Sequence, residues 1–413
     1  MLRRLAYSFL FMLISLCSIA QQRMAVSGIV TDATTGHAVA GVSISGAGQT
    51  VVTNADGLFL LKSVDQELTT IIVTHVGYST ERINVADIAA SSPALAEEPL
   101  MRIRLQPATI RLNEVLVVSS DARSLVSAAI RKITDNYSRQ PELLHCFYRE
   151  TAMKRQRYIM VAEGVVDMYK TGYGSDMRRD RVAIRKGRRL LSPRSGDTLS
   201  VKVTGGPIVP VQLDIVKNPD ILLSEEELDC YELRMETPTY IADRMQYVVS
   251  LEPRYVMPYA LYRGRLYIDQ ETLAFTRAEL SLDMSDRDKA TAVMLVRKPA
   301  GVRFRPKELS LLIDYRHEDG LTRISYVRTI FRFNCDWRRR LFATSFTATC
   351  EMAVTSHHGG DDVQPIRGRE SFDQRDAFFD QVEYFRDPDF WQDYNIIEPT
   401  ESLDRAIDRL LRR

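Results

Sequence analysis

The sequence predicts a mainly β protein, in which a small N-terminal β-sandwich precedes a larger, curved antiparallel sheet covered by a few helices. Residues 26–105 alternate short strands with turn residues about every ten positions, and residues 145–386 are rich in β-branched and aromatic side chains. We divide the chain into a signal peptide at 1–20, the sandwich at 24–107, a linker strand and helix at 108–140, a β-rich domain at 141–390, and an aromatic loop with a C-terminal helix at 391–413.

Length and charge limit the classes of protein to which the chain can belong. Its 413 residues are 45% hydrophobic and 26% charged, which is ordinary globular composition on a chain too long for one hydrophobic core. The formal net charge is +1, and loss of Arg3 and Arg4 with the signal peptide takes it to about −1. The sequence therefore predicts at least two domains and lacks the basic excess of a nucleic-acid-binding protein.

The first twenty residues have the pattern of a cleavable signal peptide. A basic start at Arg3 and Arg4 precedes an apolar run over 5–16, which is shorter than a bilayer span, and small residues end at Ala20. Cys17 follows a leucine where a lipobox needs a small residue, so we expect cleavage after Ala20 rather than lipidation. We expect a mature protein without a transmembrane helix, in the periplasm or peripherally attached to the outer membrane.

Turn residues separate the strands of the N-terminal domain. Asp32 supplies side-chain oxygens for a turn before Gly36, where a positive φ costs little. The pair Asp56-Gly57 predicts a hairpin between strands at 51–53 and 58–61. Four motifs follow one another in this domain: Val-Ser-Gly-Ile-Val-Thr-Asp-Ala-Thr-Thr-Gly, Val-Ala-Gly-Val-Ser-Ile-Ser-Gly, Thr-Asn-Ala-Asp-Gly-Leu-Phe and Val-Thr-His-Val-Gly-Tyr.

This order of motifs resembles the carboxypeptidase regulatory-like domain, a transthyretin-like sandwich. The domain is found after catalytic domains, in cell-envelope proteins and at the front of TonB-linked outer-membrane receptors. The resemblance implies a seven-stranded Greek-key sandwich that serves as an interaction or assembly module, and it implies a location in the cell envelope.

A short apolar segment at 112–118 follows the sandwich. It contains Glu114, Val115, Leu116, Val117 and Val118. It resembles the segment between this sandwich and the plug of TonB-linked receptors, which can contact the energising protein. The roughly 300 residues that follow are too few for a plug and a large transport barrel, so a transporter is not expected. The segment is either a docking segment or, as we favour, a connecting strand.

A helix is expected next, from a cap at Asp121 to about Tyr137. Its apolar stripe consists of Leu125, Val126, Ala129, Ile130 and Ile133, and we expect that stripe to cover the following sheet. Individual strands are predicted at 158–169, 246–251, 264–269, 273–283, 291–297, 303–317, 321–333 and 342–354. In the strand at 273–283, apolar and polar side chains alternate, which predicts one buried and one wet face.

The hairpin that begins at Gly264 weakly resembles a repeat of the lipoprotein-carrier half-barrel family. In that family a curved antiparallel sheet wraps an apolar cavity under helices. A curved sheet with its own packed core would explain the same residues.

Four cysteines remain after signal-peptide cleavage: Cys146, Cys230, Cys335 and Cys350. Their even number permits disulfides in an oxidising compartment, but none forms a Cys-x-x-Cys pair. Cys335 and Cys350 could face each other across a hairpin. We expect structural disulfides or buried free thiols rather than a zinc or redox site.

Seven basic residues are concentrated between positions 178 and 189: Arg178, Arg179, Arg181, Arg185, Lys186, Arg188 and Arg189. Such a cluster could bind the phosphates of an anionic lipid or an acidic glycan, at about 1 kcal/mol for each charge near an anionic membrane. Alternatively, it is an edge strand whose charges discourage pairing with other chains, and we favour this interpretation.

No motif predicts catalysis. A zinc carboxypeptidase needs a His-x-x-Glu pair and a later His, and none of the six histidines has Glu three residues on. His357, His358, Asp361 and Asp362 could bind a metal adventitiously, although an ordinary solvated loop explains them equally. Nucleophile-elbow, phosphate-loop and dinucleotide motifs are missing from the sequence. We therefore predict no catalytic, cofactor-binding or metal site.

The C-terminal end combines an aromatic loop at 389–399 with an amphipathic helix capped by Thr400. The expected apolar stripe of this helix consists of Leu403, Ile407, Leu410 and Leu411. We expect the segment to dock on the sheet, with a partner-binding tail as the alternative. A similar ending occurs in uncharacterised envelope proteins that carry this sandwich.

These observations predict a non-catalytic, exported envelope protein whose β-rich domain binds a protein, an anionic lipid or a glycan. The alternative is a periplasmic hydrolase with a divergent active site in the same domain. A binder would line the concave side of its sheet with apolar groups and a basic rim, whereas an enzyme would bring carboxylates and a nucleophile together there.

Overall fold

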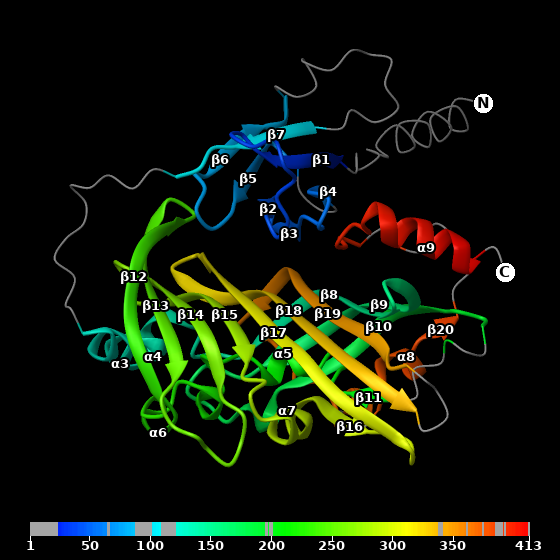
Figure 1. Cartoon of the computed structure of the whole chain (residues 1–413). Helices are drawn as coiled ribbons and strands as arrows, with labels where there is room; N and C mark the ends of the chain where they lie inside the picture. The colour runs from blue at the N-terminus through cyan, green and yellow to red at the C-terminus, as the bar shows by residue number, and fades with distance from the viewer. Residues whose placement is uncertain are drawn as a thin grey trace, which may run out of the picture.

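The computed structural model describes residues 24–63, 67–86, 101–108, 121–194, 197, 201–337, 342–360, 362–373, 376–384, 391 and 394–411. Within these residues, a small sandwich lies above one face of a large sheet, and helices lie on the other face (Figure 1). The predicted signal peptide at 1–20, with Cys17, and the predicted docking segment at 114–118 lie outside the described residues.

The N-terminal unit is built from two small sheets. Its strands are β1 (Met24–Asp32), β2 (Ser43–Gly46), β3 (Gln49–Val52), β4 (Leu58–Ser63), β5 (Thr70–Thr74), β6 (Glu81–Asn84) and β7 (Met101–Leu105). One sheet has the order β4-β1-β7 and the other β3-β2-β5-β6. Val30, Ile44, Leu61 and Ile71 are fully buried between the sheets. The predicted seven-stranded sandwich is confirmed.

The chain turns at Asp56-Gly57, but it does not form the predicted hairpin there. Asn54 Oδ1 accepts hydrogen bonds from the backbone N–H groups of Asp56 (2.9 Å) and Leu58 (3.0 Å), and Gly57 has a φ of 76°. However, β3 and β4 belong to different sheets, so the predicted hairpin is wrong. The turn carries the chain across the sandwich because both strands bury apolar side chains in the shared core.

The large sheet has the strand order β12-β13-β14-β15-β17-β18-β19-β8-β9-β10-β20. All neighbours are antiparallel except β10 and β20. The strands are β8 (Glu142–Lys154), β9 (Arg157–Lys170), β10 (Arg181–Leu191), β12 (Tyr231–Ile241), β13 (Arg244–Pro253), β14 (Tyr262–Asp269), β15 (Phe275–Leu282), β17 (Val302–Glu318), β18 (Leu321–Trp337), β19 (Thr344–Gly359) and β20 (Glu383–Tyr384), and β11 (Lys202–Val203) pairs separately with β16 (Leu295–Arg297). The predicted mainly β fold class is confirmed.

Short helices cover one face of this sheet (Figure 1). They are α3 (Ala122–Arg131), α4 (Ile133–Asn136), α5 (Val209–Gln212), α6 (Glu225–Leu228), α7 (Arg287–Met294) and α8 (Phe378–Gln381). Asp121 caps α3 by accepting from the N–H groups of Arg123 and Ser124, and Val126 and Ala129 pack against buried residues of the sheet. The predicted helix and its covering role are confirmed.

The predicted strand at 291–297 is wrong over most of its length. Asp286 caps α7 by accepting from the N–H groups of Asp288 and Lys289. Ala290 and Met294 are both fully buried. Because residues four apart share one face of a helix, this spacing favours the helix over a strand. Only the last three residues of the predicted range form a strand, β16.

Cys146, Cys230, Cys335 and Cys350 are buried free thiols. Cys335 lies opposite Thr344, and Cys350 lies opposite Thr329, in the pairing of β18 with β19. The prediction that Cys335 and Cys350 face each other is therefore wrong, because six pairs of the register separate them. Among the described residues, no helix has the length and apolar character needed to cross a bilayer.

The C-terminal helix α9 (Glu401–Leu411) lies close to both the sandwich and the large sheet (Figure 1). Thr400 Oγ1 accepts from the N–H of Leu403 at 3.2 Å, as expected of a cap. Leu403, Ile407 and Leu410 pack against Leu190 of β10, which confirms docking on the sheet. Leu411 is exposed and does not belong to the apolar stripe, contrary to prediction.

Candidate functional site

A cavity of about 380 Å³ lies on the helix-covered face of the large sheet. Strands β8, β9, β10 and β19 form its floor, and β11, the following loop and residues 376–380 close over it. Its apolar lining consists of Ala152, Ile159, Met160, Leu191, Val201, Val203, Ala348, Phe378 and Phe379. The volume falls within the range of small-molecule sites, which are about 300–1,000 Å³.

Glu150 contributes one of the polar groups that line this cavity. Its Oε1 accepts hydrogen bonds from the Tyr148 hydroxyl (2.7 Å) and from the backbone N–H of Gly206 (2.7 Å). Burial raises the pKa of the Glu150 carboxyl, and these hydrogen bonds and the positive charge of Lys202 offset that effect only in part. The carboxyl group is therefore held closer to its neutral form than an exposed glutamate.

Charged groups border the apolar lining. Asp197 accepts from Arg157 (2.7 Å), Ser192 (2.6 Å) and Lys154 (3.3 Å). Burial opposes ionisation of Asp197, but these hydrogen bonds outweigh it and lower its pKa to about 2. The cavity therefore combines an apolar interior with fixed charges at its border, an arrangement suited to an amphipathic ligand.

The described lining contains two side chains that could act as nucleophiles beside carboxylates, Ser192 with Asp197 and Cys350 with Glu150. Cys350 lies beside Glu150, but burial raises the pKa of its thiol, so a thiolate nucleophile is disfavoured. No histidine is among the described residues that line the cavity. Glu150 is the missed residue of this site. It shares the buried face of β8 with Cys146 and Tyr148, and a carboxylate in such an alternation is the signal that could have revealed it.

A histidine and a carboxylate do pair on the opposite face of the sheet. His145 Nδ1 lies 2.7 Å from Asp167 Oδ1, and the other oxygen of Asp167 accepts from Arg185 Nε at 2.6 Å. A carboxylate that orients an imidazole is part of many catalytic triads. Within the described part of the chain, however, no Ser, Thr or Cys side chain hydrogen-bonds the imidazole ring of His145, since Thr355 donates to its backbone carbonyl, so the nucleophile of a triad is missing there.

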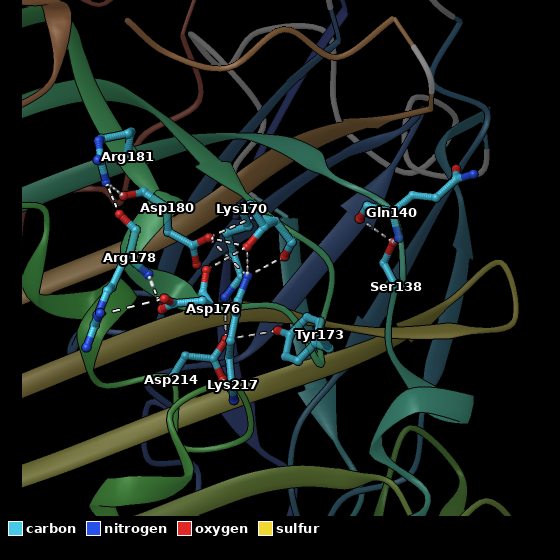
Figure 2. Close-up of polar contacts among 11 residues, drawn as sticks. Ser138, Gln140, Lys170, Tyr173, Asp176, Arg178, Asp180, Arg181, Asp214 and Lys217 are labelled. Atoms are coloured by element: carbon cyan, nitrogen blue, oxygen red, sulfur yellow. Dashed lines mark hydrogen bonds and ion pairs between the residues drawn. The ribbon is translucent and has the colours of Figure 1, made fainter. Parts of the chain in front are cut away.

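The seven predicted anion-binding residues lie on and just before β10. Arg178 and Arg179 belong to a 3₁₀ turn (η2, Met177–Arg179), where Arg178 pairs with Asp176, and Arg181 donates to the carbonyls of Arg178 and Asp180 (Figure 2). Arg179 is exposed. This part of the segment folds back on itself rather than extending as strand.

The remaining four residues are on β10 itself. Arg185 and Arg188 pair with Asp167 and Glu163 of β9, whereas Arg189 donates to the carbonyl of Phe379 on the helix-covered side. Lys186 lies 5.7 Å from the centre of the Tyr394 ring. The structure therefore divides the predicted cluster between two faces and a turn. Anion binding by these residues stays a prediction.

The edge-strand interpretation of the same residues agrees with the sheet order. Strand β10 pairs along its length with β9, but its other side pairs with β20 only at Arg188 and Arg189. Most of the outer side of β10 is therefore not covered by a described strand, and its charges are placed where they discourage pairing with another chain.

A buried network of charges and tyrosines holds the region before β10 in place (Figure 2). Asp214 is fully buried and accepts hydrogen bonds from Lys170, from Tyr173 (2.9 Å) and from Tyr315 (2.8 Å). Lys217 bonds Asp180 at 3.0 Å and the carbonyl of Thr171. Two lysines and two aspartates balance one another, so we assign this network a structural role.

The suggested metal loop at 357–362 does not assemble a site from described residues. His357 Nδ1 lies 3.9 Å from Glu318, and Asp361 lies outside the described part of the chain. No group of three His, Cys, Asp or Glu side chains that could hold a metal ion occurs among the described residues.

Comparison with known proteins assigns the N-terminal region. Residues 26–117 match the family model of the CarboxypepD_reg-like domain. This chain contains a CarboxypepD_reg-like domain. The resemblance inferred from the four sequence motifs is thereby confirmed for this region, which is less than a quarter of the chain. No curated protein matches the sequence significantly.

Two solved structures resemble larger parts of the chain. A DUF1329 family protein from Desulfovibrio piger has 10% identity and a TM-score of 0.27, and the match covers 60% of this chain and 96% of that one. A protein of unknown function from Bacteroides fragilis, provisionally named membrane-associated, has 8% identity and a TM-score of 0.16, with 81% and 98% coverage. Both TM-scores lie below 0.5, so neither structure assigns a function to this chain.

Proposed function

We propose that this is a non-catalytic, exported envelope protein whose large sheet binds an amphipathic molecule with an acyl chain. The CarboxypepD_reg-like domain serves as its interaction or assembly module. The observation that supports ligand binding is the cavity of about 380 Å³, with its apolar lining and the buried carboxyl group of Glu150. An acyl chain would occupy the apolar part, where each buried methylene contributes about 0.8 kcal/mol.

Glu150 orients the ligand in this proposal. The Glu150 carboxyl group can accept a hydrogen bond from a hydroxyl group where an acyl chain joins its headgroup, and in its neutral form it can also donate to a carbonyl group. The charged groups at the border of the cavity, Asp197 and Arg297 among them, then contact the polar headgroup. A hydrolase would instead need a nucleophile beside an effective base. Ser192 donates to Asp197 in the lining, but the lowered pKa of that carboxyl group makes it a weak base.

Binding of a fluorescent long-chain fatty acid to the purified mature protein tests this function. Ala348 of β19 lines the cavity, so Ala348→Trp should fill it and weaken binding at least about tenfold. The matched control is Thr347→Trp, because the neighbouring side chain on a strand points to the opposite face. Both variants are first checked for native circular dichroism.

Three outcomes decide the proposal. Weakened binding in Ala348→Trp alone supports the cavity. Unchanged binding in a folded Ala348→Trp protein, or no binding by the wild type, overturns it. The wild-type protein is also isolated from its own cell envelope and analysed by native mass spectrometry, where a bound lipid would identify the headgroup.

A further inference from the structure

Exposed apolar side chains gather at one end of the large sheet. Among the described residues, the large apolar side chains that are exposed are Ile72, Tyr255, Val256, Tyr259, Val296, Phe342, Tyr394 and Leu411. Five of these eight follow or precede strands at the same end of the sheet. Val256 is 91% exposed and Phe342 is 77% exposed, values that leave almost the whole side chain in water.

The antiparallel order places these residues at the same end of the sheet. Strands β13, β15 and β18 end where β14, β17 and β19 begin. Tyr255, Val256 and Tyr259 lie between β13 and β14, Val296 lies in β16 between β15 and β17, and Phe342 lies just before β19. We call this set of five residues the apolar edge. Its strand connections lie along the lower side of Figure 1, away from the sandwich.

The sandwich lies over one face of the sheet (Figure 1) and also contacts the other end of its strands. The backbone N–H of Gly77 donates to the carbonyl of Tyr240 at 2.7 Å, and that of Thr80 donates to Asp243 at 2.8 Å, both at the β12–β13 turn. Arg316, near the end of β17, donates to Thr50. The CarboxypepD_reg-like domain and the apolar edge are therefore at opposite ends of the strands.

Basic side chains accompany the apolar edge. Arg254, Arg287, Arg297 and Arg303 are exposed there, and none of these four has an ion pair with a described carboxylate. Several carboxylates at this end are already engaged: Asp283 with Arg263, Asp286 with Lys289 and with the cap of α7, and Asp336 with Arg305. Exposed Asp288 offsets one of the four charges. Glu226 and Glu227 of α6, which precedes β12 at this end, add negative charge, and Glu227 accepts from the Tyr259 hydroxyl at 2.8 Å. The arginines of β10, by contrast, are mostly paired.

We propose that the apolar edge, with Arg254, Arg287, Arg297 and Arg303, docks this protein on an anionic lipid surface. Tyrosine, phenylalanine and valine side chains at the tips of separate connections can enter the boundary between headgroups and acyl chains, while arginines beside them bind lipid phosphates. Apolar groups spread over the tips of separate connections, among arginines that have no ion pair with a described carboxylate, match a charged, soft surface better than the flat, continuous patch of a protein interface. Arg297 also lines the cavity, so docking brings the cavity border to the lipid.

Sedimentation with lipid vesicles tests the docking surface. The mature protein is mixed with vesicles of phosphatidylcholine alone or with about 30% phosphatidylglycerol, and we expect binding only to the anionic vesicles and weaker binding at high salt. Tyr255→Ser combined with Val256→Ser, and separately Arg254→Ser combined with Arg287→Ser and Arg303→Ser, should each reduce the bound fraction at least about fivefold.

Two control variants separate this surface from other candidates. Ile72→Ser removes an exposed apolar side chain of the sandwich, and a variant with Ser at Arg185, Lys186, Arg188 and Arg189 removes the charges of β10. Both should bind vesicles like the wild type. Loss of binding in the β10 variant alone, or no binding by the wild type, overturns the proposal.

A self-association assay excludes a second copy as the occupant. If the wild type is a dimer in gel filtration and Tyr255→Ser with Val256→Ser makes it monomeric, the apolar edge is a dimer interface and the lipid proposal fails. The fatty-acid binding assay, repeated with the same edge variants, distinguishes lipid docking by the apolar edge from ligand binding in the cavity. Edge variants should bind the probe normally, since they leave the apolar lining of the cavity unchanged.

Discussion

A buried charged side chain in the large sheet is stabilised where side chains of opposite charge contact it. Glu163 is almost fully buried, and Arg149 and Arg188 donate to its two oxygens at 2.7 Å each. Burial alone would raise the pKa of Glu163, but the two guanidinium groups outweigh it and lower the pKa. Glu150 accepts hydrogen bonds from a hydroxyl and a backbone N–H, and these together with the charge of Lys202 do not outweigh its burial, so its pKa is raised. The two glutamates therefore differ in the direction of their pKa shift because only Glu163 has two guanidinium partners.

The buried pair of Asp214 and Lys170 gives a stability prediction. Asp214→Asn should lower the free energy of unfolding by about 3–5 kcal/mol, because Lys170 would be left without its opposite charge in the protein interior. Lys170 and the tyrosine hydroxyls lower the pKa of Asp214 in the folded protein despite its burial. Urea unfolding followed by circular dichroism measures the loss at neutral pH.

The same pair predicts a pH dependence. A carboxyl group with a lowered pKa stabilises the fold above its unfolded value, about 3.9, and this contribution disappears as the pH falls through the folded pKa. The difference in unfolding free energy between wild type and Asp214→Asn should therefore shrink below about pH 4. A difference that is small at neutral pH, or constant down to acid pH, would contradict the assigned role.

Among helices and strands, the sequence predicted features that depend on neighbouring residues and missed features that depend on packing of a whole domain. The helices α3 and α9 were predictable because Asp121 and Thr400 act on backbone groups two or three residues away. The assignment of β3 and β4 to different sheets was not predictable. The turn between them is present, but packing of the whole sandwich decides which sheet each strand joins. In 291–297, β-branched residues suggested a strand, but the cap at Asp286 and two buried residues four apart set the helix.

The candidate cavity was beyond prediction for the same reason. Its lining comes from strands β8, β9, β10 and β19 and from segments near 203 and 378, which lie far apart along the chain. Neither β8 nor β12 is among the individual strands that the sequence predicts. The basic residues at 178–189 were visible in sequence, but their division between two faces depends on the carboxylates of β9 and on a bulge between Ile184 and Lys186.

Helix α9 is stabilised by the sandwich as well as by its own cap. Asp56 Oδ2, in the turn between β3 and β4, accepts a hydrogen bond from the backbone N–H of Glu401 at 2.7 Å. A carboxylate at a helix N-terminus satisfies a free N–H and interacts favourably with the helix dipole. Asp56→Ala should therefore destabilise α9 by about 1 kcal/mol without unfolding the sheet.

Hydrogen exchange measures this effect. Amides of α9 should exchange about fivefold faster in Asp56→Ala, while those of β17 and β18 should keep their protection. Thr400→Ala, which removes the cap within the chain, is the positive control. Unchanged exchange in α9 would mean that the contact with the sandwich contributes nothing to the helix.

At the scale of the whole molecule, the C-terminal segment joins the sandwich to the sheet. Asn395 Oδ1 accepts from the backbone N–H of Lys62 at 2.8 Å, and its amide nitrogen donates to the carbonyl of Lys62 at 2.9 Å, as a neighbouring strand would. The Trp391 ring packs edge-on against Phe147 of β8 with ring centres 5.6 Å apart. Val52 of the sandwich belongs to the same buried cluster as Trp391 and Phe147.

This arrangement predicts that the sandwich and the sheet unfold together only while Trp391 is in place. Trp391→Ala removes a buried ring from the cluster between them, a change that typically costs about 3–5 kcal/mol. Differential scanning calorimetry should show one transition for the wild type and two for Trp391→Ala, because each unit keeps its own core. Tyr394→Ala, at a partly exposed ring nearby, should keep the single transition. One transition in Trp391→Ala would show that the direct contacts of Tyr240, Asp243 and Arg316 suffice to couple the two units.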